Sequence, residues 1–205
     1  MREKCPIFPL LWLLGLAAVV AWSAMGPTGW LVWWMEALPA LLAVGILAAT
    51  YKKFRFTPLV YLLVWLHCVV LLVGAHYTYE CVPLFDWIRD AFGQARNNYD
   101  KLGHFAQGFV PALVARELLI RTSGLGRGKW MFTLIVLSIL GISAIYELVE
   151  WWAAEALGET ADSFLGTQGD IWDAQKDMFC ALVGAICALL TLSRAQDRQL
   201  ARLGK

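Results

Sequence analysis

Charged residues are scarce in this chain. Only 16% of its 205 residues are Asp, Glu, Lys or Arg, whereas 60% are hydrophobic. This balance departs from the usage of soluble globular domains and is typical of membrane proteins. A membrane-spanning helix needs roughly 20 mostly apolar residues, so six such helices with short connections would use most of the chain. We therefore expect a single integral membrane domain over residues 1–205 and no separate soluble domain.

The cysteines lack the spacing of a zinc site or a disulfide framework, because there are five of them and no CxxC pair. A cleavable signal sequence is not expected either. Arg2 and Lys4 precede a long apolar run, but Trp22 stands two residues before Ala24 and does not fit an A-x-A cleavage site. We expect this first apolar run to remain as a helix. The chain also has no internal repeat and no low-complexity segment.

Long apolar runs, in contrast, occupy most of the sequence. They predict six transmembrane helices at about residues 6–25, 30–50, 58–77, 102–119, 130–151 and 174–192. Gly26 and Pro27 separate the first two, and Pro58 fits the first turn of the third, where its missing N–H is not needed. The expected fold class is therefore all-α, a polytopic membrane helix bundle.

Lys and Arg are unequally divided between the two sides of these helices. If the spans alternate in direction, 13 of the 17 basic residues lie on the side of the termini, and the exceptions are Arg89, Arg96, Lys101 and Lys176. Cytoplasmic loops carry an excess of Lys and Arg, so both termini are expected in the cytoplasm. Eight tryptophans agree with this orientation, because rings of this kind favour the interface and these lie near the expected outer ends: Trp22, Trp30, Trp33, Trp34, Trp87, Trp151, Trp152 and Trp172.

Ionisable residues gather at the expected outer side. Such residues are costly in hydrocarbon and normally face a partner or a water-filled cavity. Asp100 and His104 are four residues apart and share one helical face, and Glu147 lies near the outer end of the fifth span. Further acidic groups at this depth are Glu36, Glu150, Asp170, Asp173 and Asp177. These positions predict an acidic, histidine-containing pocket at the outer face.

Three kinds of chemistry remain open for this pocket. In the first, a divalent cation is held by Asp100, His104, Asp170, Asp173 and Asp177, and His104 or Glu147 is the general base of an enzyme acting on an envelope lipid. In the second, crowded carboxylates share protons with His104, as in a proton-coupled carrier. In the third, the cluster only holds the helices together. In that case the single residues would have ordinary structural roles. Asp100, Asp170 or Asp173 would cap a helix, Lys101 and Lys176 would be solvated, and His67 would be packed and hydrogen-bonded.

Two motifs are similar to a known family. YDKLGHFAQG at residues 99–108 and GTQGDIWDAQKDM at residues 166–178 resemble the YjdF family of bacterial inner-membrane proteins, as do Glu36 with Pro39 and YELVEWW at residues 146–152. The resemblance runs through nearly the whole chain. It implies a multi-pass protein of the bacterial inner membrane, but it supplies no reaction.

A more distant resemblance is to VanZ-like membrane proteins. Their pattern has Asp-Lys-x-x-His at the start of one helix, a Glu in the next, and an Asp before a glycine-containing helix segment. The matching residues here are Asp100, Lys101, His104, Glu147 and Asp177, with Gly184 following. The pattern usually has Asn four residues after that Asp, where this chain has Ala181. An envelope role follows only by analogy.

Together these observations predict an inner-membrane protein whose outward-facing pocket binds an envelope lipid or a small anionic ligand through a divalent cation. The alternatives are a proton-coupled carrier of small solutes and a structural or accessory membrane protein. Whether the chain is an enzyme stays open. We expect the lipid bilayer as its environment and no nucleic-acid partner, and the oligomeric state is not predicted.

Overall fold

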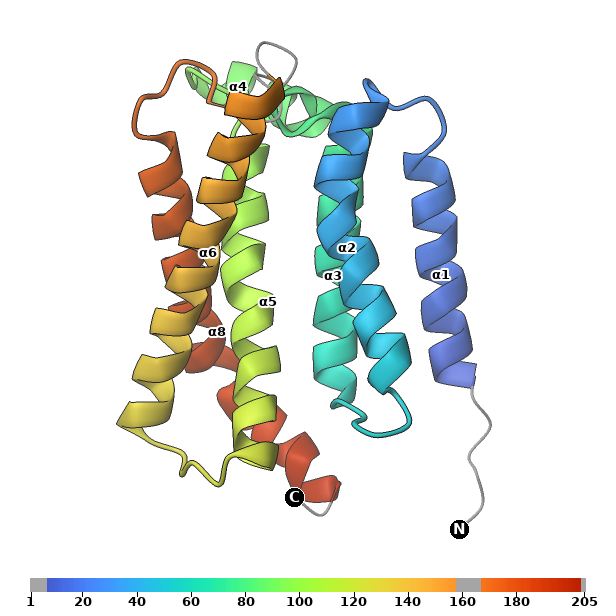
Figure 1. Cartoon of the computed structure of the whole chain (residues 1–205), viewed down its shortest axis with the longest axis vertical. Helices are drawn as coiled ribbons and strands as arrows, with labels where there is room; N and C mark the ends of the chain where they lie inside the picture. Colours follow the sequence, from blue (N-terminus) through green and yellow to red (C-terminus); the bar gives the residue numbers. More distant parts are fainter. Residues whose placement is uncertain (1–6, 158–166, 204–205) are drawn as a thin grey trace.

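The computed structural model describes residues 7–157 and 167–203, and the regular structure within them is entirely helical. The elements are α1 (Ile7–Ser23), α2 (Trp30–Thr50), α3 (Pro58–Tyr77), η1 (Tyr79–Cys81), α4 (Pro83–Phe92), α5 (Tyr99–Thr122), α6 (Lys129–Leu157) and α8 (Asp173–Arg202). The all-α expectation is confirmed. The long helices run side by side, with the start of α1 and the end of α8 at one end of the bundle and α4 at the other (Figure 1). These are called the terminal end and the α4 end below.

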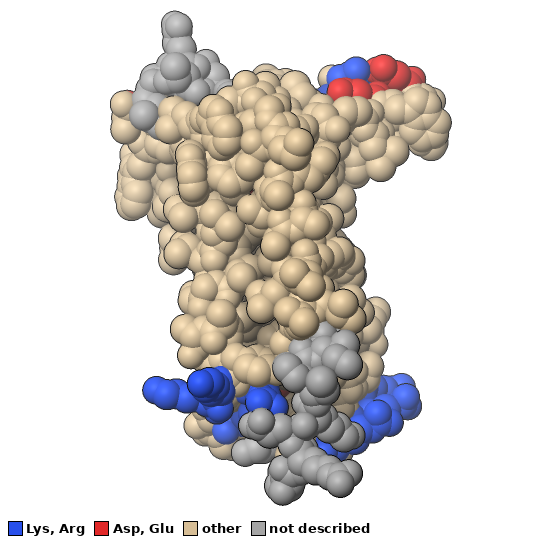
Figure 2. All heavy atoms as spheres, turned by 90° about the vertical axis from the view of Figure 1, so that its right-hand side faces the viewer, with Lys and Arg blue, Asp and Glu red and all other residues tan. Residues whose placement is uncertain are grey.

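Within residues 7–157 and 167–203, four helices are long and apolar enough to cross a membrane, namely α2, α3, α6 and α8, and α1 is a shorter apolar helix. A polytopic membrane bundle therefore fits the structure. The face drawn in Figure 2 carries Lys and Arg near the terminal end and both basic and acidic residues at the α4 end. Between the two ends, this face shows no charged residue. Such an uncharged belt is what contact with the hydrocarbon of a bilayer requires.

Several helix boundaries differ from those expected. α5 begins at Tyr99 rather than at residue 102, because the side-chain oxygen of Asn97 accepts the Tyr99 N–H at 3.0 Å. α8 continues to Arg202, well past residue 192, and its last turns bury Gln196 and Leu200. The expected connection at residues 78–101 contains η1 and the amphipathic helix α4. The apolar side chains of Leu84, Trp87 and Phe92 on α4 are exposed.

Helices α5 and α8 approach each other backbone to backbone, and two glycines make this approach possible. A Cβ atom at Gly108 would collide with the carbonyl oxygen of Ala181, and one at Gly184 would collide with the carbonyl oxygen of Phe105. Small residues of this kind let helix backbones pack directly in membrane bundles. This packing fixes how the polar residues of α8 face those of α5.

The expected belt of tryptophans is only partly surface-exposed. Seven of the eight residues are exposed, but Trp33 is buried, with 3% of its surface accessible. Its indole N–H donates to the Ser23 hydroxyl at 2.9 Å, and that hydroxyl donates to the Leu72 carbonyl at 2.6 Å. The His76 ring nitrogen lies 3.0 Å from the Ser23 carbonyl oxygen. Trp33 and His76 therefore join α1, α2 and α3.

Candidate functional site

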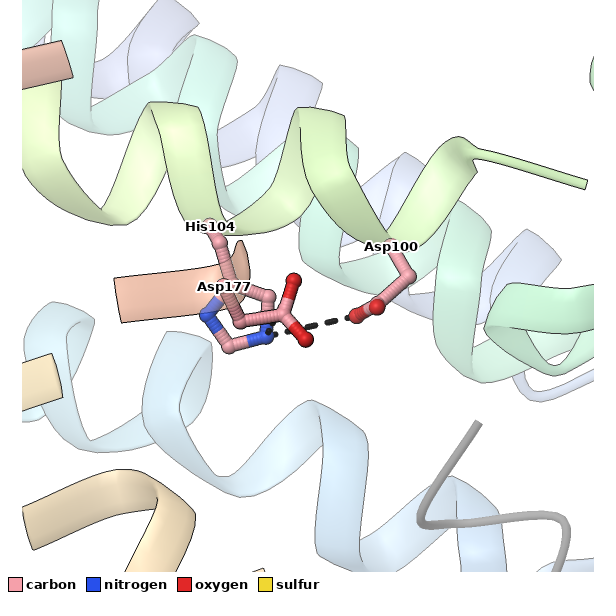
Figure 3. A group of neighbouring side chains, drawn as sticks. All are labelled: Asp100, His104 and Asp177. Carbon is pink, nitrogen blue, oxygen red and sulfur yellow. Dashed lines mark ion pairs between the residues drawn. The ribbon is translucent and has the colours of Figure 1, made fainter. Parts of the chain in front are cut away.

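Three of the expected site residues converge at the α4 end of the bundle. The side chains of Asp100 and His104 on α5 point toward that of Asp177 on α8 (Figure 3). Nε2 of His104 lies 3.3 Å from Oδ1 of Asp100 and 3.9 Å from Oδ1 of Asp177. All three residues are buried, and one potential ligand atom from each lies within 4.8 Å of the others. Two carboxylates and an imidazole at this spacing are a suitable donor set for a divalent cation.

Two basic side chains also enter this cluster. Nζ of Lys101 lies 2.8 Å from both carboxylate oxygens of Asp177, 2.5 Å from Asp173 and 3.3 Å from Asp100. Nη1 of Arg96 lies 2.5 Å from Asp173. Only 16% of the Lys101 side chain is exposed, so its expected role as a solvated neighbour is wrong. The protein's own cations compensate much of the acidic charge, and a metal ion would have to share Asp177 with Lys101.

Asp170 and Asp173 have different partners from Asp100, His104 and Asp177. Asp173 is paired with Arg96 and Lys101, as described above. Oδ2 of Asp170 lies 2.5 Å from Nζ of Lys176, and Oδ1 accepts the Trp172 N–H at 3.1 Å, just before α8. The Lys176 ammonium holds the pKa of Asp170 below its usual range. The expected cap of this helix by Asp170 or Asp173 is not formed, because the N-cap residue of α8 is Trp172 and no side chain caps it. Asp100 points toward His104.

His104 connects two carboxylates. Its Nε2 faces Asp100, and its Nδ1 lies 3.0 Å from the Gln107 amide oxygen and 3.6 Å from Oε1 of Glu147 on α6. Oε1 of Glu147 has no hydrogen-bond partner within residues 7–157 and 167–203. An imidazole between two carboxylates can take a proton on one nitrogen and release it from the other. The arrangement is therefore chemically suited to acid–base work as well as to metal binding.

A cavity of about 480 Å³ adjoins this cluster. Its wall comes from α2, α3, α5, α6 and two connecting segments. Near the α4 end the wall is polar and includes Glu36, Tyr79, Asp100, His104, Tyr146 and Glu150. Toward the terminal end it is apolar and reaches Phe54, Phe56 and Leu118. The cavity therefore has one polar end and a long apolar remainder.

Two polar atoms on this wall lack hydrogen bonds in the described part of the chain. They are Oε2 of Glu36 and Nε2 of His67. Glu36 has only 3% of its surface exposed. Buried polar groups are normally paired, so both atoms are available to something that enters the cavity. His67 was expected to be packed and hydrogen-bonded, and the structure shows that its Nε2 is not.

The end of the cavity is shaped by a tyrosine that the sequence did not single out. The ring of Tyr79 lies between α3 and α5, where a Cβ atom at Gly74 or at Gly103 would collide with it. Gly103 belongs to the YDKLGH motif, so part of that motif makes room for this ring. No periodicity in the sequence signals such a contact.

Gln168 of the second motif pairs with Asn97, which lies just before the first motif, and neither residue was predicted as part of the site. The Asn97 N–H donates to the side-chain oxygen of Gln168 at 3.0 Å, and the Gln168 side-chain N–H donates to the Asn97 carbonyl at 2.9 Å. Arg96 also donates to the Thr167 carbonyl at 3.1 Å. These bonds attach the segment before α8 to the start of α5, next to the buried cluster.

Comparison with known proteins places the chain in a family. The family described as "Predicted membrane protein (DUF2238)" matches residues 8–198. The chain belongs to this family. It is similar to the inner membrane protein YjdF of Escherichia coli (strain K12), with 48% identity over 192 residues, which cover 93% of this chain and 91% of the relative. Membership confirms the resemblance seen in the motifs, and it assigns a multi-pass protein of the bacterial inner membrane. No solved structure matches the chain.

Proposed function

We propose that this member of the family is a lipid-binding protein of the bacterial inner membrane. In this proposal the polar end of an envelope lipid lies beside Asp100, His104 and Glu36, and its chain lies in the cavity. The observation that carries the proposal is the cavity itself, which is apolar along most of its length and ends at buried carboxyl and imidazole groups. Ligand sites are commonly concave, mostly apolar and ~300–1,000 Å³ in volume, with a few polar groups that fix orientation.

The proposal includes six spans, with both termini in the cytoplasm and the α4 end facing outward. α1 and α5 would complete the set of spans beside the four long apolar helices. α5 carries its ionisable residues toward its two ends, which leaves an apolar middle from Phe109 to Ala115. The excess of Lys and Arg at the terminal end supports this orientation. The pocket would then be open to molecules of the outer leaflet or the periplasm.

A divalent cation is a second proposed occupant of the cluster. Asp100, His104 and Asp177 would supply one ligand atom each, and the spacing of those atoms favours this role. Asp170 and Asp173 could join only if their ion pairs with Lys176 and Arg96 opened. A bound cation could in turn attract an anionic headgroup, and His104 or Glu147 would then be the acid–base residue of any reaction there.

Two alternatives to lipid binding each have an observation in their favour. His104 between Asp100 and Glu147 suits a proton-coupled carrier, and proton flux in proteoliposomes that disappears in Glu147→Gln would support it. The ion pairs of Lys101 suit a purely structural cluster. In that case the polar variants would lose stability and would still bind as much lipid as the unmodified protein.

The decisive experiment fills the cavity. Val64 lines it from α3, whereas Leu62 on the same helix is exposed on the bundle surface. Native mass spectrometry of the purified chain is expected to find a retained lipid in the unmodified protein and in Leu62→Trp, and to find it lost in Val64→Trp. Equal retention in both variants would contradict lipid binding in this cavity.

Metal analysis of the unmodified protein beside Asp177→Asn and His104→Ala tests the proposed divalent cation. Absence of metal from gently purified protein would contradict the cation proposal.

A further inference from the structure

Carboxyl groups predominate among the ionisable residues of the cavity wall. In the described part of the chain, the lining includes three carboxyl residues, Glu36 from α2, Asp100 from α5 and Glu150 from α6, and no Lys or Arg. His104 also lines it, with Nε2 3.3 Å from Oδ1 of Asp100. The remaining polar residues there are histidines, tyrosines, glutamine and threonine. Carboxylates repel an anionic group and attract a cationic one. The wall therefore favours a ligand with a positive charge at its polar end.

The nearby cations are already held in ion pairs. Nζ of Lys101 lies 3.3 Å and Nη2 of Arg96 lies 3.6 Å from Oδ2 of Asp100 on the cavity wall, and their shorter contacts are with α8. Nζ of Lys101 contacts Asp173 and Asp177 at 2.5 to 2.8 Å, and Nη1 of Arg96 contacts Asp173 at 2.5 Å. Asp173 and Asp177 do not line the cavity. An anion in the cavity would have to draw these side chains out of short ion pairs in a buried cluster, which is costly.

Glu36 supplies a separate observation. Its side chain is almost completely buried and lines the cavity, and Oε2 has no partner among the residues that the structure describes. The carboxyl group has a hydrogen bond from the Tyr79 backbone, but a buried oxygen that lacks a partner is unfavourable. An ammonium group has three donors and no acceptor, so it could donate to more than one carboxyl group of this wall. Glu36, Asp100 and Glu150 come from three helices and face one end of the cavity.

We infer that the ligand is a cationic amphiphile, in which a primary ammonium group lies among Glu36, Asp100 and Glu150 and one alkyl chain fills the apolar part of the cavity. The inference rests on the proposed function for the presence of a bound amphiphile, and it adds the chemistry of the polar end. Both an aminolipid headgroup and a free alkylamine have this chemistry.

The test compares three probes that differ only at the polar end. Each is an alkyl chain of the same length with a photoreactive diazirine in its middle, ending in an amine, a carboxylate or a hydroxyl group. With the full chain in neutral detergent, the amine probe is expected to label cavity peptides around Val64, Leu71 and Val110. It should do so roughly tenfold more efficiently than the carboxylate probe, since a charge-assisted hydrogen bond contributes enough for such a ratio.

The outcomes separate this inference from the proposed function. Equal labelling of the cavity by all three probes would overturn the ammonium inference and leave lipid binding standing. Labelling led by the carboxylate probe would also overturn it. Absence of cavity labelling by every probe would overturn both.

Two carboxyl variants and one control locate the ammonium group. Glu36→Gln and Glu150→Gln are each expected to lower labelling by the amine probe about tenfold and to leave labelling by the hydroxyl probe unchanged. Glu155→Gln is the matched control, because Glu155 is an exposed residue of α6 outside the cavity. Unchanged amine labelling in either correctly folded cavity variant, judged by gel filtration, would overturn the three-carboxyl site.

Competition then distinguishes the two sources of the amine. The chain is placed in nanodiscs of phosphatidylcholine, to which phosphatidylethanolamine, phosphatidylglycerol or a soluble alkylamine is added. Reduced labelling with phosphatidylethanolamine supports an aminolipid, and reduction by the alkylamine alone supports a free amine. Equal competition by phosphatidylglycerol would contradict recognition of an ammonium group.

Discussion

The ammonium nitrogen of Lys101 lies 2.8 Å from each carboxylate oxygen of Asp177, across the interface between α5 and α8. The same nitrogen contacts Asp173 and Asp100. One lysine thus compensates the charge of three buried carboxylates. The pair has two consequences: it stabilises the interface between α5 and α8, and it occupies part of the space beside the three potential metal ligands.

Replacement of Lys101 by methionine is expected to destabilise the protein by about 3–5 kcal/mol, because it removes the ammonium group that contacts both oxygens of the buried Asp177 carboxylate. Lys176→Met is the control, since the Lys176 side chain is 55% exposed and an exposed ion pair contributes only about 0–1 kcal/mol. Thermal unfolding in detergent, followed by tryptophan fluorescence, measures both variants. Equal effects would show that the Lys101 cluster has no special stabilising role.

The same variant tests the divalent cation. In Lys101→Met, a cation bound by Asp100, His104 and Asp177 would replace the missing positive charge, so added Mn²⁺ or Mg²⁺ is expected to raise the unfolding temperature. In Lys101→Met/His104→Ala the increase should be smaller, since one ligand is lost. An unfolding temperature of Lys101→Met that does not respond to either ion would count against the metal proposal.

Alanine at two glycines is expected to have opposite effects. Gly108→Ala should destabilise the bundle by about 1–3 kcal/mol, because its Cβ collides with the backbone of α8. Gly141→Ala in α6 has nothing within 4 Å of its Cβ, and it should be neutral or stabilising by up to about 1 kcal/mol, since alanine favours helix. The unfolding temperatures of the two variants and the unmodified protein, measured side by side, test both expectations. A stable Gly108→Ala protein would mean that α5 and α8 pack less closely.

Glu117 is expected to stabilise the terminal end. Its fully buried carboxylate accepts the N–H of Thr57 at 3.0 Å and the Thr57 hydroxyl at 2.8 Å, and lies 2.8 Å from Arg121. Glu117→Ala leaves these donors unpaired and should cost about 3–5 kcal/mol. It should also speed hydrogen exchange in the first turn of α3. Glu155→Ala, at an exposed position, should change neither the stability nor the hydrogen exchange of α3. Normal protection of α3 in Glu117→Ala would contradict the stabilising role of Glu117.

Membrane orientation has a direct test. In a variant with the native cysteines replaced by serine, Asp90→Cys on α4 and Arg202→Cys at the end of α8 place one thiol at each end of the bundle. A maleimide that cannot cross membranes is expected to label Asp90→Cys in spheroplasts and to label Arg202→Cys only after lysis. The reverse pattern would place the pocket in the cytoplasm, and labelling of both in spheroplasts would contradict the three spans between residues 90 and 202.

Much of the fold is evident from residue order alone. The apolar runs predict α2 and α3 with the ranges that the structure has, because segments of this length and hydropathy form helices in a bilayer. Helical spacing places Asp100 and His104 on one face. The motifs of residues 99–108 and 166–178 are sufficient to indicate the family.

The partners of the polar residues depend on contacts between helices. Lys101 follows Asp100 directly in sequence, and its position among the aspartates of α8 depends on the close approach at Gly108 and Gly184. The η1 and α4 segments have too few residues for a strong periodic signal. Their placement comes from bonds to Asn97, such as its donation to the Val82 carbonyl at 3.1 Å.

The sequence by itself therefore determined the class of protein, its principal helices and the side of the bundle where acidic groups gather. These properties depend on hydropathy and on the repeat of a single helix. Only the tertiary structure decided which acids are compensated by Lys101 and Arg96, and which, like Glu36, face a cavity. The rotation and separation of neighbouring helices set those distances, and steric contacts between residues far apart in the chain determine both.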